Sequence, residues 1–272
     1  MLMRPLEKTA MRLILDGIVS LSVLLAASLA LVITAAARPA PVELSVAAAA
    51  DLSSALKEIA ASYEQRTGVR LRLSFGASGM LTQELQNGAP FDVFLSADMD
   101  YPRQLIAAGL AEDNTLVQYA RGKLVLWIPS DSRLDLEHQG MNALLDPSVK
   151  NIAIANPQHA PYGRAAIAAL KHSGLYDRIK DRLVMGENVA QAAQFVESGN
   201  AQAGFVALAR ARALEMSGKG KYWEVPAENY PPLDQGAVIL TRSQHKREAL
   251  DFLRYLASSQ ALELLRKFGF AK

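Results

Sequence analysis

The sequence predicts an α/β fold of two doubly wound lobes that are joined by crossing strands. From residue 42 onward, short apolar runs alternate with stretches of helical periodicity, which is typical of mainly parallel sheets with helices on both faces. The roughly 230 residues of this part exceed one comfortable α/β domain. No internal repeat or low-complexity linker marks a boundary, so we expect crossing strands rather than a flexible tether between the lobes.

The individual elements follow from this alternation. The expected strands are 42–49, 69–75, 91–95, 124–128, 152–155, 204–208 and 237–240. Apolar residues at helical spacing predict helices over 52–63, 81–85, 102–108, 163–172, 189–196, 246–257 and 260–268. Asp51 is a candidate N-cap of the first helix, and Asn188 with Gln191 resembles a capping box at the fifth.

The lobe boundaries are expected where polar, proline and glycine residues interrupt the pattern, near 118–123 and 231–236. The predicted units are residues 1–41 as a signal peptide or anchor, 42–120 plus 233–272 as lobe 1, and 121–232 as lobe 2.

The N-terminus indicates export. Arg4, Lys8 and Arg12 precede an apolar run over 13–37 that ends in three alanines, the order of a cleavable secretory signal. A retained transmembrane anchor is the alternative, because the run is long enough to span a bilayer. We favour cleavage and expect the folded part in the periplasm or on the extracytoplasmic face of the membrane.

Composition and motifs argue against several classes of protein. The net charge is only +2 and the basic residues are scattered, so no nucleic-acid partner is expected. The chain has no cysteine, which excludes disulfides and thiol chemistry. No hydrolase, zinc-protease or phosphate-loop motif is present. Four histidines lie far apart in sequence and are expected on the surface rather than around a metal ion: His138, His159, His172 and His245. We expect a binding protein, with no catalytic residue and no cofactor.

Four turns lead from a strand into a helix through small or polar residues. They are 47–51, 76–79, 161–163 and 186–189. In a doubly wound sheet such turns gather at the carboxyl ends of the strands, where ligands bind. Their free N–H groups and helix dipoles form an anion site without lysine or arginine. Gly79 and Gly163 would let the backbone approach a ligand closely.

The motifs in these turns resemble those of a known family. Residues 46–56 (VAAAADLSSAL), 75–81 (FGASGML), 89–98 (APFDVFLSAD), 155–163 (ANPQHAPYG), 186–190 (GENVA), 204–208 (GFVAL) and 267–270 (KFGF) are similar to periplasmic molybdate-binding proteins. The resemblance implies a type II periplasmic-binding fold and an oxyanion, molybdate or tungstate, held in the cleft between the lobes. It also implies an ABC permease as partner, and we expect a monomer.

The same resemblance implies the ligand donors. They are the turn at Asp51, the hydroxyl and N–H of Ser78, and the N–H groups of Tyr162 and Val189. Four further positions are less certain candidates: Ala50, Ser53, Gly79 and Ala207.

Two positions depart from the family's pattern. Some members have serine at position 51, and a carboxylate facing a dianion would be repelled. We therefore expect the Asp51 side chain to cap its own helix and to offer only its N–H. Some members have tyrosine at position 207, so Ala207 leaves one donor absent or replaced by Ser53 or water.

Two other functions stay open at this point. The chain could bind a different anion, such as sulfate, phosphate or a small carboxylate, or be an exported enzyme with an unrecognised site.

Overall fold

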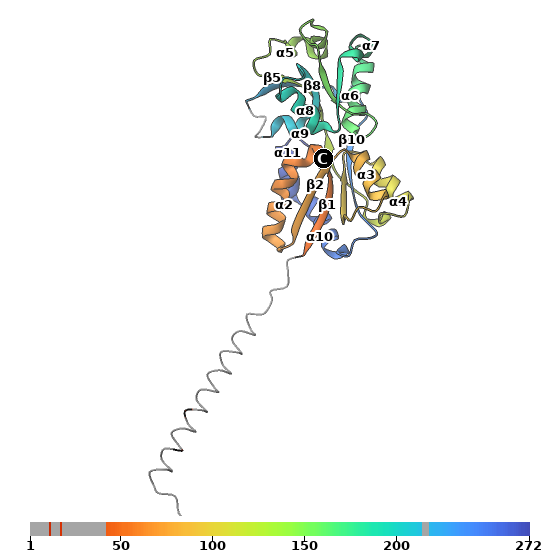
Figure 1. The fold of residues 1–272 in the computed structure, drawn as a ribbon, viewed down its shortest axis with the longest axis vertical. Helices are drawn as coiled ribbons and strands as arrows, with labels where there is room; N and C mark the ends of the chain where they lie inside the picture. Colours follow the sequence, from red (N-terminus) through yellow and green to blue (C-terminus); the bar gives the residue numbers. More distant parts are fainter. Residues whose placement is uncertain (1–10, 12–16, 18–41, 214–217) are drawn as a thin grey trace, which may run out of the picture. The chain divides into compact units, whose positions relative to one another are not determined.

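The strands from residue 42 onward form two five-stranded sheets, each covered by its own helices. The computed structural model describes Met11, Gly17, 42–213 and 218–272, so the predicted signal or anchor lies almost wholly outside the described residues. The first sheet has the order β2-β1-β3-β10-β4 and the second has the order β7-β6-β8-β5-β9. We call each sheet with its helices lobe 1 and lobe 2. In Figure 1, α2, α3, α4 and α10 flank the first sheet, and α5, α6 and α8 flank the second.

The bounds of the elements of lobe 1 are as follows. The strands are β1 (Glu43–Ala49), β2 (Arg70–Gly76), β3 (Val93–Ser96), β4 (Val117–Gly122) and β10 (Leu233–Ile239). The helices are the short 3₁₀ helix η1 (Ala50–Leu52), α2 (Ser53–Thr67), α3 (Ser78–Gln86), α4 (Asp100–Ala107), α10 (Lys246–Leu256) and α11 (Ser259–Lys267). A core around Tyr63 and Phe252, whose rings meet edge-on at 5.2 Å, holds α2 and α10 together on this sheet.

Lobe 2 is built in the same way. Its strands are β5 (Leu124–Pro129), β6 (Ile152–Ala155), β7 (Leu183–Gly186), β8 (Ala203–Ala207) and β9 (Gly220–Glu224). Its helices are α5 (Leu136–Gln139), α6 (Pro161–His172), α7 (Tyr176–Ile179), α8 (Val189–Glu197) and α9 (Leu208–Arg212). Trp127 and Phe205 are fully buried in its core.

The expected α/β class is confirmed, but the sheets are mixed rather than mainly parallel. β1 pairs in parallel with β2 and β3, and β6 pairs in parallel with β7 and β8. β10 is antiparallel to β3 and β4, and β5 is antiparallel to β8 and β9. The reason is that β10 enters its sheet from the other lobe and therefore runs against its neighbours.

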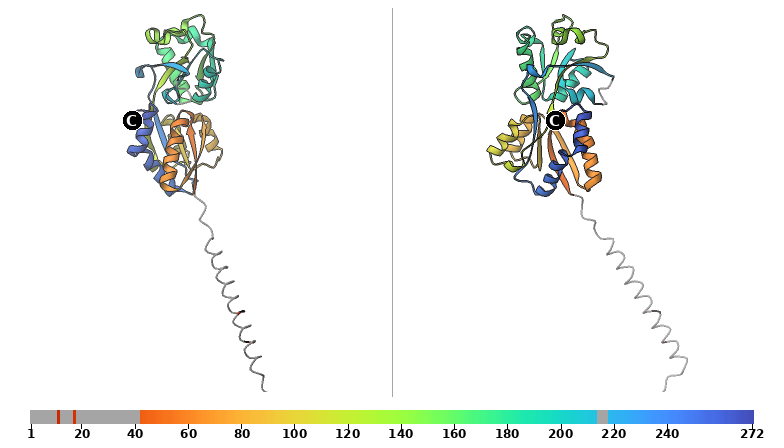
Figure 2. Two further views of the ribbon diagram at one scale, coloured as in Figure 1. Left: turned by 90° about the vertical axis from the view of Figure 1, so that its left-hand side faces the viewer. Right: turned by 180° about the vertical axis from the view of Figure 1, so that it is seen from behind.

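The segments predicted to cross between the lobes lie side by side. β4 and β10 form one antiparallel pair, and β5 begins directly after β4. Ala271, which precedes the last residue Lys272, forms a bridge with Arg121 of β4, and in Figure 2 the chain end lies where the two lobes meet. The predicted lobe boundaries remain a proposal. Within the part of the chain that the structure describes, no helix is both long and apolar enough to cross a membrane.

Candidate functional site

The carboxyl ends of four strands meet around one small cavity. The cavity has a volume of about 10 Å³. Its walls are formed by Ala49, Ala50, Asp51, Gly76, Ser78, Ala97, Ala160, Pro161, Tyr162, Asn188 and Val189. β1 leads into η1 and β2 into α3 from lobe 1, while β6 leads into α6 and β7 into α8 from lobe 2. Each lobe therefore contributes two helix starts, and none of the lining residues is a lysine or arginine.

Ser78 is the first residue of α3 and is oriented as a donor. Its Oγ accepts a hydrogen bond from the N–H of Ala97 at 3.0 Å, so the hydroxyl hydrogen must point elsewhere. Its own N–H lies in the first turn, where the helix supplies no acceptor. Ser78 is 1% exposed and lines the cavity, so neither group is hydrated by bulk water.

At the start of α6 the local sequence leaves one N–H free. Pro161 has no N–H, and the N–H of Gly163 donates to the carbonyl of Ala160 at 3.0 Å. Tyr162 lies between them. Its N–H is the first of this helix, and the turn supplies no acceptor for it. Gly163 is required here because a Cβ at this position would lie 2.2 Å from the carbonyl oxygen of Ala155. The glycine therefore allows close packing on β6, and its role in the approach of the ligand stays a prediction.

At the start of α8, Asn188 caps the helix, as the sequence predicted. The Asn188 side chain accepts hydrogen bonds from the N–H groups of Ala190 at 3.0 Å and Gln191 at 3.1 Å. The Gln191 side chain accepts from the N–H of Glu187 at 2.6 Å. The cap leaves the N–H of Val189, which lines the cavity, without a side-chain acceptor.

Asp51 lies in η1 and does not cap a helix, contrary to our expectation. Neither η1 nor α2 has a side-chain cap. The Asp51 carboxylate instead accepts a hydrogen bond from Nε2 of Gln235 on β10, and Gln235 in turn accepts from the Tyr119 hydroxyl at 2.7 Å. A buried amide on the crossing strand thus replaces the expected helix cap as its partner.

Burial raises the pKa of Asp51 from 3.8 to about 6. The Gln235 hydrogen bond opposes this rise, and the Tyr162 hydroxyl and nearby backbone N–H groups oppose it less. The Tyr162 hydroxyl lies close enough to the carboxylate to lower its pKa. Oδ1 of Asp51 and the Tyr162 hydroxyl are both buried, and neither makes a hydrogen bond of ordinary geometry.

The structure brings together the four main residues predicted to bind the ligand, namely Asp51, Ser78, Tyr162 and Val189, and also Ala50. The other three candidates do not line the cavity. Ser53 starts α2, the Gly79 N–H donates to the His159 carbonyl at 2.8 Å, and Ala207 is buried where β8 pairs with β5. The ligand contacts themselves stay predictions.

A second cluster, which the sequence did not reveal, joins the lobes beside the cavity. We call Asp98, Tyr101, His159 and Arg164 the interlobe clasp. Arg164 of lobe 2 forms an ion pair with Asp98 of lobe 1 and donates to the Tyr101 hydroxyl at 3.1 Å. The Tyr101 hydroxyl also lies 3.4 Å from the His159 carbonyl oxygen. Asp98 lies in the stretch 89–98, which resembles the family, but nothing in the local sequence indicates that it pairs with Arg164, 66 residues away.

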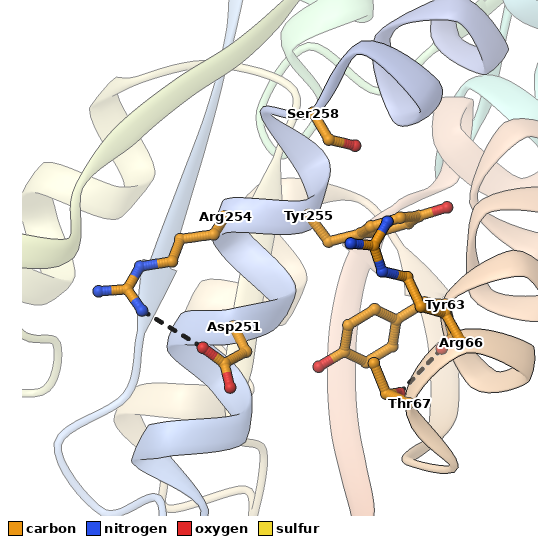
Figure 3. A pocket seen from close by; sticks show the side chains of 7 residues that line it. All are labelled: Tyr63, Arg66, Thr67, Asp251, Arg254, Tyr255 and Ser258. Carbon is orange, nitrogen blue, oxygen red and sulfur yellow. Dashed lines mark hydrogen bonds and ion pairs between the residues drawn. The ribbon is translucent and has the colours of Figure 1, made fainter.

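Another pocket lies between α2 and α10 (Figure 3). Its volume is about 320 Å³. It is lined by Tyr63, Arg66, Thr67, Asp251, Arg254, Tyr255 and Ser258. Arg254 pairs with Asp251 at 3.3 Å, as Figure 3 shows. This pocket contains none of the predicted site residues.

Within 42–213 and 218–272, no group of three or more histidine, aspartate or glutamate side chains could hold a metal ion.

Comparison with known proteins identifies the family of the chain. Residues 44–271 match the family described as bacterial extracellular solute-binding protein. The chain belongs to this family. The molybdate-binding protein ModA of Rhodobacter capsulatus is 38% identical over 245 residues, covering 90% of this chain and 94% of that protein. Its counterpart in Azotobacter vinelandii is 40% identical over 228 residues, covering 84% and 89%.

The solved structures agree with the family assignment. The periplasmic molybdate-binding protein of Azotobacter vinelandii superposes with a TM-score of 0.79 at 35% identity, covering 84% of this chain and 99% of that chain. The predicted resemblance and fold are thereby confirmed, and the family is one of solute-binding proteins rather than enzymes.

Proposed function

We propose that this solute-binding protein captures molybdate, and also tungstate, between its lobes and delivers the anion to the permease of an ABC importer. One observation carries the proposal: four helix starts, two from each lobe, converge on a cavity without a basic side chain. Free N–H groups and positive helix ends favour an anion at such a point. The relatives named molybdate-binding proteins support molybdate as that anion.

The cavity is far too small for a drug-sized ligand. Pockets for drug-sized ligands occupy about 300–1,000 Å³, whereas this cavity measures about 10 Å³. The donors approach from opposite lobes, Ser78 from one side and Tyr162 and Val189 from the other. A tetrahedral oxyanion has an acceptor in every direction and can accept hydrogen bonds from both sides, unlike a flat carboxylate.

The location and assembly of the protein belong to the same proposal. The charge, apolar run and alanines of residues 1–41 support export, with the folded part acting as a monomer outside the cytoplasmic membrane. The permease is the partner to which the loaded protein would dock.

A thermal-shift screen tests this function against its alternatives. We expect molybdate and tungstate to raise the melting temperature, because a ligand at a hundredfold excess over its dissociation constant stabilises the folded state by about 2.7 kcal/mol. Sulfate and phosphate serve as controls of similar shape. A shift with phosphate or sulfate alone would favour a different anion, and no shift with any oxyanion would contradict the proposal.

The interlobe clasp gives a second prediction. Arg164→Gln removes the charged partner of Asp98, so the liganded, closed form should open more readily. The Arg164 side chain is 41% exposed, which limits the effect to about a threefold to tenfold faster dissociation of molybdate. Stopped-flow exchange measures this rate.

The matched control is Arg210→Gln, which breaks the ion pair between Arg210 and Glu197 within lobe 2. We expect it to change stability but not the dissociation rate. Equal effects of the two variants on the dissociation rate would show that the clasp has no special role in closure.

A further inference from the structure

The carboxyl group of Asp51 is the one acidic side chain in the wall of the proposed oxyanion site. It is 3% exposed, and its two oxygens differ in their surroundings. Oδ2 accepts the hydrogen bond from Gln235, while Oδ1 is buried without a partner. An ionised carboxylate in this place would repel a dianion. The groups that could stabilise its charge are all uncharged: the Gln235 amide and, less strongly, the Tyr162 hydroxyl and nearby backbone N–H groups.

The neighbouring elements supply no positive charge that would keep Asp51 ionised. Tyr162 of α6 and Tyr119 of β4 face the carboxyl group, and burial raises the pKa of both hydroxyls well above 10, so both stay neutral. The other charged side chains at the start of α2 and on α6, α8, α9 and β10 are exposed or engaged elsewhere. Lys57 is exposed, and Arg212 packs beside Gly269. The remaining ones form ion pairs: Arg164 with Asp98, Arg210 with Glu197, and Asp234 with Arg121.

We propose that Asp51 is protonated in the liganded protein and donates a hydrogen bond from its second oxygen to the bound oxyanion, so that binding takes up one proton. The inference rests on the proposed function and adds the protonation state of the site. The proton comes from solvent and forms an O–H bond on the Asp51 carboxyl group. No other bond changes, and the ligand remains the dianion.

The hydrogen-bond pattern suits this neutral form. A carboxylic acid accepts a hydrogen bond at one oxygen, here Oδ2 from Gln235, and donates one from the other. Protonated Oδ1, which has no partner in the structure, could therefore donate to an oxygen of the ligand. Burial already favours the neutral form before any ligand arrives. A dianion within contact distance raises the pKa of the carboxyl group further, because it disfavours a second negative charge.

The sign of the pH dependence follows from this linkage. Above a pKa of about 6, the ligand-free protein holds Asp51 mainly ionised and must take up the proton on binding. The dissociation constant for molybdate should therefore rise up to about tenfold for each pH unit above 7 and level off near or below pH 6.

The experiment is calorimetric titration of the full-length protein with micromolar molybdate between about pH 6.5 and 8.5. Repeating it in buffers of different ionisation enthalpy counts the protons. We expect uptake of about one proton at pH 8. Binding heat without proton uptake and with a constant affinity would overturn the inference while leaving the proposed function intact. Absence of binding would overturn both.

Asp51→Asn is the matched variant, because its amide accepts from Gln235 and donates from the other atom, as the protonated acid would. It should bind molybdate without proton uptake and with an affinity that varies less than about twofold over the same pH range. His159→Gln, which alters the imidazole in the loop before Tyr162, should keep the pH dependence. If Asp51→Asn kept it and His159→Gln lost it, the proton would belong to the imidazole and the inference would be wrong.

Discussion

Replacing Gly163 with alanine is expected to weaken molybdate binding by more than about tenfold and to lower the free energy of unfolding by about 1–3 kcal/mol. The added Cβ would lie 2.2 Å from the carbonyl oxygen of Ala155 and 2.8 Å from the nitrogen of Pro157, both fixed backbone atoms. The start of α6 must therefore move away from β6 and carry the Tyr162 N–H with it. Calorimetric titration and denaturant unfolding measure the two effects.

A second variant with a similar loss of stability separates the effect of moving the Tyr162 N–H from the effect of destabilising the protein. Ala168→Gly lies on α6 beyond its first turn and should cost about 1 kcal/mol of stability, because glycine is a poor helix former. It leaves the helix start in place, so its affinity should stay near that of the unmodified protein. Equal loss of affinity in both variants would contradict a role for the position of the Tyr162 amide.

Ser78→Ala should lower the affinity for molybdate by about tenfold or more, because hydrogen bonds to charged groups contribute about 1.5–3 kcal/mol. The variant removes the hydroxyl whose hydrogen is left free by the bond from the Ala97 N–H. One ligand oxygen would then lack a donor. Calorimetric titration at a fixed pH gives the change in affinity.

Ser243→Ala is the matched control for this experiment. Ser243 is also buried, and its hydroxyl donates to Asp92 at 2.7 Å, away from the cavity. We expect this control to lose stability and keep its affinity. An unchanged affinity in Ser78→Ala would mean that the serine only supports the Ala97 amide.

Much of the site could be predicted because its signals are local. Asn188 caps a helix through groups two and three residues away, and the order of Ala160, Pro161 and Tyr162 determines which N–H of α6 stays free. Such short-range patterns depend on helix geometry, which the sequence displays directly. The four turns were found for this reason, and the resemblance then indicated their common ligand.

The parts that escaped prediction depend on contacts between distant residues. Asp51 bonds to Gln235 across 184 positions, and Arg164 to Asp98 across 66. Their side chains carry no periodicity or capping pattern that would indicate a partner. The strands β7 and β9 were missed because β7 is only four residues long, and lysine and glutamate break the apolar pattern of β9. The mixed sheets depend on the direction in which β5 and β10 enter them, which composition does not determine.

Competition between molybdate and sulfate tests the central claim most directly, because both are tetrahedral dianions and differ chiefly in size. The proposed donors are mainly backbone N–H groups at helix starts, and the packed sheet of each lobe fixes their positions within that lobe. A smaller ion would leave several hydrogen bonds stretched beyond about 3.2 Å, where they lose most of their strength. We expect a large excess of sulfate to leave bound molybdate in place in a calorimetric displacement titration. Displacement by sulfate at a concentration comparable to that of molybdate would contradict a rigid site built for the larger anion.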